Sequence, residues 1–359
     1  MGFGVILKFI FWCAASWGSV LVLEYKAPDD DTHHGESVEH IACKSSVVDC
    51  GVFYTEFFLE DFQKEIESVL TETTVVNMSF GFQNPDFVIG GGPSRRGGGS
   101  APFDDEETVR KKFNKQKDNL EEMFLNNQDV LFTIASGNGF FIGPIPTKGA
   151  PLGKRFAVYP AYSEGDNLLK VSAVDGLGVD FENLAQQSIE PYANYSLWNV
   201  DVAAVVEENH EGERLNGTSF AAPYVARLAG EMRNNYPKLR PVDVKEIIMK
   251  SSYVKNIERA IWASQDYKAK GEESVVFKVH NDRNVKRRNE FKEEIGDILL
   301  VKSGGVVVPE AAHLCAKIYQ EAVGLLSIED ACLESQKHTL YANKYRTELL
   351  KKLWRLRGF

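Results

Sequence analysis

The stretch LNGTSFAAPYVARLAG, Leu215–Gly230, decides the fold class of this chain. Gly217 permits a tight turn, Thr218 or Ser219 can cap free N–H groups, and Pro223 is tolerated in the first turn of a helix. The pattern predicts a helix that begins here and packs closely through small residues. Ser219 would then lie beside free backbone donors and the positive end of the helix dipole, where an oxyanion is stabilised. The alternative is an ordinary buried helix with a serine cap.

The longer string NGTSFAAP, Asn216–Pro223, resembles the nucleophile segment of the subtilases, the subtilisin-like serine proteases. Phe220 stands where that family usually has Met. The resemblance implies that Ser219 is the nucleophile and that the chain has an α/β fold, in three α/β/α layers around a mostly parallel sheet. A serine needs a base and an oxyanion donor, so both must lie elsewhere in the sequence.

The predicted base is His34, in the string HGESV of residues 34–38, which resembles the histidine segment of the same family. The pattern of Gly35–Ala42 predicts a helix with one apolar side. Imidazole titrates near neutrality, so it can take the serine proton and return it to the leaving amine. Without the serine motif, His34 would be a loop histidine, or a weak metal ligand with His33 and Asp31.

Strand and helix patterns alternate after the histidine, which predicts a parallel sheet with crossover helices. Residues 47–55 and 74–81 have strand patterns, and residues 60–70 have a helix pattern. The string VNMSFG, residues 76–81, also resembles the subtilase strand whose end lines the substrate cleft, where its backbone would pair with an extended peptide. The alternative is a core strand with a turn. The substrate-binding residues that the resemblance implies are Ser79, Phe80 and Gly81.

The oxyanion donor that the resemblance implies is Asn138, in the Ala-x-Gly-Asn pattern that ends the buried segment Val130–Gly139. Its amide would act together with the backbone N–H of Ser219. Asn between two glycines is otherwise explained by its tolerance of positive φ.

The third triad residue is the gap in the pattern, because the family places an Asp at the end of an early strand, with another strand before the histidine. Here the apolar segment Val20–Leu23 ends at Glu24, ten residues before His34. Three explanations stay open: a start further upstream, a substitute carboxylate, or a degenerate relative that binds peptides without cutting them. The candidate substitutes are Glu24, Asp29, Asp30 and Asp31.

Length and charge bound the remaining possibilities. The 359 residues allow one large α/β domain, and a net charge of −10 argues against general nucleic-acid binding. We expect a catalytic domain over 24–320, with an insertion at about 255–297, and a basic helical tail over 321–359. The tail could make weak contact with a membrane surface or dock on its own domain. No cofactor is required; calcium is possible, but no residues are assigned to it.

The first 23 residues read as a secretory signal or as the first strand of the domain. Loss of Cys13 with a signal would leave an even number of cysteines. Neighbouring pairs are plausible, but three connectivities and four reduced thiols remain open. The remaining cysteines are Cys43, Cys50, Cys315 and Cys332. We therefore expect a secreted or periplasmic protein, and we read the glycine-rich residues 82–100 as a flexible flap near the cleft.

The function predicted from the sequence is a serine endopeptidase that cleaves peptide or protein substrates through an acyl-enzyme on Ser219. The alternative is a catalytically weak or inactive subtilase-like peptide-binding protein without the triad Asp. A membrane-associated interaction protein that uses the basic tail is a third possibility.

Overall fold

The structure is a computed structural model of the chain. The residues that it describes are 19–25, 34–55, 62–83, 106–139, 141–142, 145–146, 149, 152–153, 157–175, 188–189, 193–208, 211–213, 215–254, 257–270, 301–322, 324–339 and 344–359. The signal-like residues 1–18, the glycine-rich residues 84–100 and most of the predicted insertion lie outside these ranges.

A seven-stranded sheet forms the centre of the fold, in the order β10-β9-β5-β3-β1-β2, with β11 also paired to β9. All neighbours are parallel except β10, which is antiparallel to β9. This confirms the mostly parallel α/β sheet. The strands of the sheet are β1 (Val20–Tyr25), β2 (Cys50–Thr55), β3 (Val75–Met78), β5 (Leu131–Ala135), β9 (Leu168–Asp175), β10 (Ser188–Ile189) and β11 (Val202–Val205).

Two small antiparallel pairs lie beside the main sheet: β4 (Phe82–Gln83) with β8 (Val158–Tyr159), and β6 (Phe141–Ile142) with β7 (Ile145–Pro146). Strand β4 begins at Phe82, shortly after β3 ends at Met78, and β8 precedes β9. The β4–β8 pair therefore joins the segment after β3 to the segment before β9.

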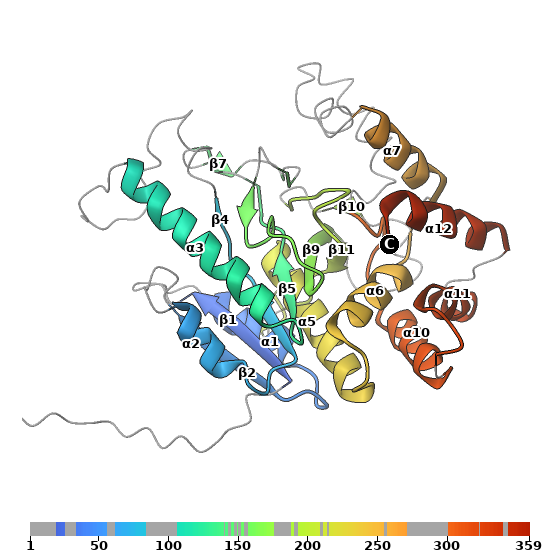
Figure 1. The fold of residues 1–359 in the computed structure, drawn as a ribbon, viewed down its shortest axis with the longest axis horizontal. Coiled ribbons are helices and arrows are strands. Elements are labelled where there is room, and N and C mark those ends of the chain that lie inside the picture. The colour runs from blue at the N-terminus through green and yellow to red at the C-terminus, as the bar shows by residue number, and fades with distance from the viewer. Residues whose placement is uncertain are drawn as a thin grey trace, which may run out of the picture.

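Helices cover both faces of the sheet, as Figure 1 shows with α3 in front of the strands and α5 behind them. On one face, a Cβ added to Gly230 of α5 would come within 2.4 Å of Val20 in β1. On the other, the rings of Phe124 in α3 and Phe132 in β5 are 4.8 Å apart. The helices are α1 (His34–Ala42), α2 (Phe62–Val69), α3 (Glu106–Asn126), α5 (Thr218–Asn235), α6 (Pro241–Ser251), α7 (Ile257–Lys270), α10 (Pro309–Glu321), α11 (Ile328–Thr339) and α12 (Lys344–Arg357).

Small residues let α5 lie against the sheet. Ala221, Ala222, Ala226 and Ala229 are fully buried, and the missing side chain of Gly230 leaves room for Val20. Any larger residue at position 230 would push α5 away from β1. The small and apolar run in the sequence is therefore the packing surface of the helix that carries Ser219 at its start.

The order of elements near the N-terminus differs from the family pattern used above. Residues 20–23 form most of β1, an interior strand of the sheet. Among the described elements, α1 is the next one after β1, and β2 comes after α1 and pairs with the outer side of β1. Among the described elements, the strand that pairs with β1 on this side thus comes after the histidine, while residues 26–33, between β1 and α1, lie outside the described ranges.

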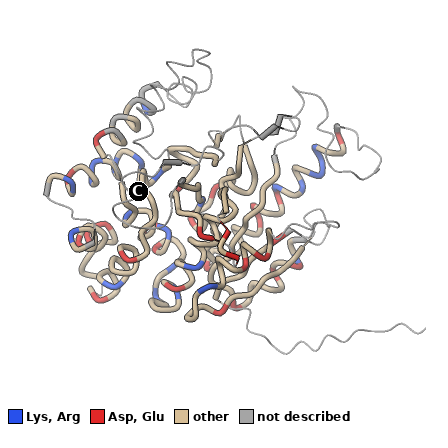
Figure 2. Tube along the Cα trace, turned by 180° about the vertical axis from the view of Figure 1, so that it is seen from behind, with Lys and Arg blue, Asp and Glu red and all other residues tan. Residues whose placement is uncertain are grey.

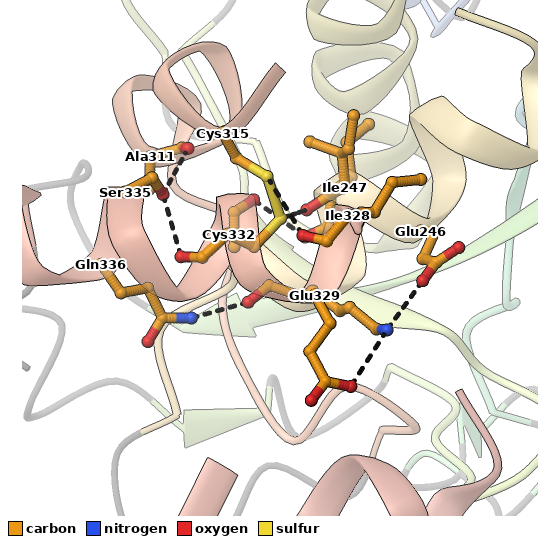
Figure 3. Close-up of a disulfide and its surroundings, with 12 residues drawn as sticks. Glu246, Ile247, Ala311, Cys315, Ile328, Glu329, Cys332, Ser335 and Gln336 are labelled. Atoms are coloured by element: carbon orange, nitrogen blue, oxygen red, sulfur yellow. Dashed lines mark hydrogen bonds and ion pairs between the residues drawn. A yellow bond between two sulfur atoms is a disulfide. The ribbon is translucent and has the colours of Figure 1, made fainter. Parts of the chain in front are cut away.

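Two disulfides join cysteines that are near each other in the sequence, Cys43–Cys50 and Cys315–Cys332. The second links α10 to α11 in a fully buried position (Figure 3). One turn beyond Cys332, Gln336 Nε2 donates to the main-chain oxygen of Lys250 in α6, at 2.6 Å. The bridge therefore holds α11 where it contacts α6, and the neighbouring pairing is the one that the structure forms.

The basic tail docks on the protein itself. Leu350, Leu353 and Trp354 of α12 are buried in a small apolar cluster with α7. The guanidinium of Arg357 donates to the main-chain oxygens of Val301 and Lys302, at 2.5 and 2.7 Å. The apolar side of this helix is thus already covered, so the expected membrane contact through the tail is not supported.

Helix α7 occupies the start of the predicted insertion, residues 257–270, and shows that this part of the chain belongs to the packed structure. Within the described residues, no helix is both long and apolar enough to cross a membrane. Figure 2 shows acidic and basic residues interspersed along the described helices.

Candidate active site

Ser219 lies in the first turn of α5, half-buried, as the glycine and proline around it predict. Gly217 has φ +110°, a conformation that side chains disfavour, and its carbonyl accepts from the N–H of Phe220 at 3.1 Å. The hydroxyl of Ser79 donates to the main-chain oxygen of Ser219 at 2.7 Å. The turn at Gly217 and the hydrogen bond from Ser79 together fix the backbone of Ser219. The N–H of Ser219 has no acceptor in the described part of the chain.

Asn138 lies beside this helix start, after the end of β5. Its Oδ1 accepts from the N–H of Thr218 at 2.8 Å and from the Thr218 hydroxyl at 3.1 Å. Because Oδ1 is held by Thr218, the Nδ2 amino group points away from Thr218. Among the described residues, Nδ2 has no acceptor. A Cβ at Gly217 would lie 2.9 Å from Nδ2, so the glycine also makes room for the amide.

Thr218 is a site residue that the sequence reasoning did not single out. It is fully buried, and its hydroxyl also accepts from the N–H of Gly137 at 3.0 Å. It therefore joins the start of α5 to the turn after β5. The string Asn-Gly-Thr-Ser carried the signal, but Thr218 was read only as a helix cap.

His34 is the first residue of α1, and its Nδ1 lies 3.3 Å from Oε1 of Glu24 in β1. The Glu24 side chain is 7% exposed, whereas the His34 side chain is 31% exposed. The ring of His34 is 5.2 Å from the ring of Phe220, the residue next to Ser219. The structure thus brings together the carboxylate, the imidazole and the helix start that carries Ser219.

Gly35 explains how the longer Glu side chain fits beneath α1. A Cβ at this position would lie 3.1 Å from Cγ of Glu24 and 3.1 Å from the ring and hydroxyl of Tyr54. Tyr54 is paired with Glu24 across β1 and β2. Burial and the nearby carboxylates of Glu39, Glu24 and Glu36 raise the pKa of the Tyr54 phenol, which therefore stays neutral in the physiological range.

No hydrogen bond joins Ser219 Oγ to His34 within the described residues. Catalytic hydrogen bonds are often long without substrate and tighten in the complex. The other carboxylate candidates, Asp29, Asp30 and Asp31, and His33 with them, lie outside the described ranges. In those ranges no group of three His, Cys, Asp or Glu side chains could hold a metal ion.

The predicted substrate-binding segment Ser79–Gly81 leaves the sheet between Ser219 and β8. Ser79 is buried and accepts from Asn77 Nδ2 at 2.9 Å, while Gly81 is exposed. Phe80 is half-buried against the core. Asn77 was also missed by the sequence reasoning, although a buried Asn inside an apolar strand is itself a signal, because such a group needs a partner.

Comparisons with known proteins place this geometry in context. A profile described as the subtilase family, Peptidase_S8, matches residues 30–279. A search among curated proteins found no match.

Three of the similar solved structures carry protease or subtilase names. The prenylagaramide maturation protease PagA is 18% identical over 67% of this chain and 84% of its own, with a TM-score of 0.39. The patellamide maturation protease PatA is 15% identical over 83% and 96%, with a TM-score of 0.41. The subtilase cytotoxin SubAB assembly is 13% identical over 90% and 86%, with a TM-score of 0.43.

Proposed function

The chain belongs to the subtilase family of proteases, and from this premise we propose that it is a serine endopeptidase acting through an acyl-enzyme on Ser219. One observation carries the proposal: the Glu24 carboxylate lies 3.3 Å from Nδ1 of His34, whose ring contacts the residue next to Ser219. A histidine supported by a buried carboxylate beside a serine at a helix start is the arrangement that acyl transfer requires.

In the proposed reaction, Ser219 Oγ attacks the peptide carbonyl while His34 takes its proton. The oxyanion that forms accepts hydrogen bonds from the N–H of Ser219 and from Nδ2 of Asn138, two donors without acceptors in the described chain. His34 then protonates the leaving amine as the C–N bond breaks. Water, deprotonated by His34, then attacks the ester carbonyl. The bond between that carbon and Ser219 Oγ breaks, His34 gives its proton to Oγ, and the acid product leaves.

In this proposal Glu24 is the third residue of the catalytic triad, in place of the Asp that the family has. Its carboxylate would hold the imidazole with Nδ1 protonated and stabilise the imidazolium that forms. The Cγ methylene of Glu24 lies beneath Gly35, which has no side chain to occupy that space. The substitution is supported by the positions of the two residues, since Glu24 in β1 lies 3.3 Å from Nδ1 of His34, the first residue of α1.

The proposed substrate is an extended peptide that pairs with the backbone of Ser79–Gly81. Exposure of Gly81 and the tie from Ser79 to the Ser219 carbonyl support this position. The proposed location is secreted or periplasmic, because two disulfides in one chain favour an oxidising compartment.

The test is labelling of the purified, folded chain with a fluorophosphonate probe, beside Ser219→Ala and His34→Ala. We expect labelling of the native chain, none of Ser219→Ala, and labelling reduced by about 10³-fold or more for His34→Ala. As a control, Ser68→Ala removes an exposed hydroxyl on α2 and should label normally. Folded native protein that does not label would support the peptide-binding alternative instead.

A further inference from the structure

Helices α1 and α5 pack side by side, and each carries one proposed catalytic residue near its start, namely His34 on α1 and Ser219 on α5. The ring of His34 lies 5.2 Å from the ring of Phe220. Seven residues further along both helices, Nη1 of Arg227 donates to the main-chain oxygen of Ile41 at 2.8 Å. The equal spacing shows that the two helices run in the same direction, with contacts about 10 Å apart along their length.

The contact at Ile41 gives α1 a hydrogen-bond donor that the helix itself lacks. The last four carbonyls of a helix have no partner within it, and because α1 ends at Ala42, the Ile41 carbonyl is one of them. This end of the helix also carries the negative pole of its dipole, which a cation stabilises. The guanidinium of Arg227 supplies both the donor and the charge, so it caps α1 from the neighbouring helix.

Glu207 holds the guanidinium in place. Nη1 and Nη2 of Arg227 donate to Oε2 and Oε1 of Glu207 at 3.0 and 2.8 Å, a two-bond pair that fixes the plane of the guanidinium. The guanidinium also lies over the ring of Tyr224, 5.2 Å from its centroid. Glu207 closely follows the end of β11 at Val205, so the pair also joins the two helices to the central sheet. Lys44, just beyond α1, lies 3.4 Å from Oε2 of Glu207.

The Arg227–Glu207 pair stays charged at neutral pH. Burial favours the neutral carboxylic acid, but hydrogen bonds and charge from Arg227 and Lys44 outweigh this effect and lower the pKa of Glu207 below its ordinary value. The side chains of Arg227 and Glu207 are only 13% and 23% exposed. A substitution that removes one of them therefore leaves a largely buried charge without its two-bond partner.

The position of His34 depends on how α1 sits on α5. A displacement of about 1 Å between reacting groups can lower the rate by about 10²-fold. Apolar packing between the helices is non-directional, so it limits sliding and pivoting less than hydrogen bonds do. The Cys43–Cys50 disulfide ties the end of α1 to β2 and not to α5. The hydrogen bond from Arg227 to Ile41 is directional and joins the two helices themselves.

We infer that Arg227, oriented by Glu207, is a positioning residue for the proposed reaction: it fixes α1 on α5 so that the His34 imidazole stays within reach of Ser219. The inference rests on the proposed function and adds to it a residue that does not touch the reacting atoms. Arg227 lies eight residues beyond Ser219, about 12 Å along α5. Its loss should therefore lower kcat and leave KM nearly unchanged.

The experiment compares wild type with Arg227→Met and Arg227→Lys in steady-state peptide hydrolysis, well below the melting temperature of each protein. We expect Arg227→Met to lower kcat by about 10²-fold with KM nearly unchanged. Arg227→Lys keeps the charge but not the two-bond geometry, so its kcat should lie between the other two. Arg233→Met is the matched control, because Arg233 is also half-buried on α5 but donates to the Asp129 carbonyl, and kcat should stay at the wild-type value.

A double variant separates positioning from stability. Glu207→Gln added to Arg227→Met removes the carboxylate that has lost its partner, so the Tm of the double variant should exceed that of Arg227→Met. The donor to Ile41 stays absent, so kcat should remain about 10²-fold low. A kcat that returns to the wild-type value together with Tm would overturn the inference, because Arg227 would then act through stability alone.

Fluorophosphonate labelling keeps the two hypotheses apart. If wild type labels and folded Arg227→Met has the wild-type kcat, the inference is wrong and the proposed function stands. Folded wild type that does not label contradicts the proposed function and the inference with it. If Arg227→Met does not fold, Arg227→Lys decides, since a folded Lys variant with unchanged kcat would also overturn the inference.

Discussion

The two faces of the central sheet differ in the polar side chains that they bury. Val20 contacts α5, and alternate residues of a strand share a face, so Glu24 in β1 lies on the face that α1 and α5 cover. Asn77 in β3 and Thr133 in β5 lie on the same face, and all three are buried. On the opposite face, the same strands bury apolar residues, namely Leu21, Leu23, Val76, Met78, Phe132 and Ile134.

The buried polar groups of the α5 face lead toward Ser219. The Thr133 hydroxyl lies 3.5 Å from Asn77 Oδ1, Asn77 Nδ2 donates to Ser79, and Ser79 donates to the Ser219 carbonyl. Buried polar groups are costly unless they are hydrogen-bonded. On this face their hydrogen-bond partners belong to the candidate site. The same hydrogen bonds therefore satisfy the buried polar groups of the strands and hold the backbone of Ser219 in place.

Lys170 in β9 is the contrasting case, on the face away from α5. It aligns with Ile134 and is 7% exposed. Burial lowers its pKa to about 8; Asp201 and Glu164 oppose this effect, while Lys245 and Lys302 add to it. In the described structure no hydrogen bond or ion pair involves its ammonium group. The free-energy cost of burying Lys170 is therefore unconnected with the candidate site. A buried charge alone does not identify a functional site.

The largest effect should follow from Glu24→Gln, which keeps the shape of the side chain but removes its charge. A neutral amide stabilises neither the required tautomer nor the imidazolium, so we expect kcat to fall by about 10³- to 10⁴-fold. Peptide hydrolysis measured with matched thermal melts checks this. Glu39→Gln, an exposed change on α1 that also removes one charge, is the control. Equal activity of the two variants would remove Glu24 from the proposed mechanism.

Asn138→Ala should have the next largest effect, because it removes one oxyanion donor and leaves the serine and histidine in place. We expect kcat to fall by about 10²- to 10³-fold with KM little changed, since the lost bond forms in the transition state. Steady-state kinetics separates the two constants. Asn234→Ala, at the other end of α5, should behave as wild type. A rise in KM with unchanged kcat would assign Asn138 to ground-state binding instead.

The sequence predicted most of the fold because its signals are local. The small-residue run of α5 and the apolar strands each specify one element, and parallel pairing follows from their alternation with helices. The predicted boundaries were a few residues too wide, as for residues 47–55, where β2 begins at Cys50. That strand starts at a cysteine bridged to Cys43, a restraint that no strand pattern contains.

The carboxylate position could not be predicted because it depends on connection geometry. His34 comes only ten positions after Glu24, which leaves no room for another strand, and this was read as a gap in the triad. The structure instead places β2 after α1, so no intervening strand is needed. Only the three-dimensional arrangement reveals that Glu24 reaches the histidine. Docking of the tail likewise depends on α7, whose pattern was too charged to indicate a core.

Gly35→Ala should have a smaller effect on activity, because the added methyl group takes up space beneath α1 next to Glu24. The new Cβ would lie 3.1 Å from Cγ of Glu24 and from Tyr54, so one of them must shift by a few tenths of an ångström. We expect about a 10-fold loss of kcat/KM without loss of thermal stability, because Ala favours a helix by about 1 kcal/mol over Gly. Adding Tyr54→Ala removes one wall and should restore part of the activity. No restoration in the double variant would show that the space beneath α1 does not set the Glu24 position.

The smallest effect on activity is expected for Lys170→Met, which tests the opposite face through stability alone. The folded-state pKa of Lys170, about 8, lies below its ordinary value of 10.5, so between these values only the unfolded chain holds the proton. Wild type should therefore gain stability relative to Lys170→Met as pH rises from 8 to 10.5, by at most about 1.4 kcal/mol per pH unit. Denaturant unfolding of both proteins across this range measures the difference. Exposed Lys352→Met should run parallel to wild type. Parallel curves for Lys170→Met as well would mean that Lys170 has an ordinary pKa and that its burial on this face carries no such cost.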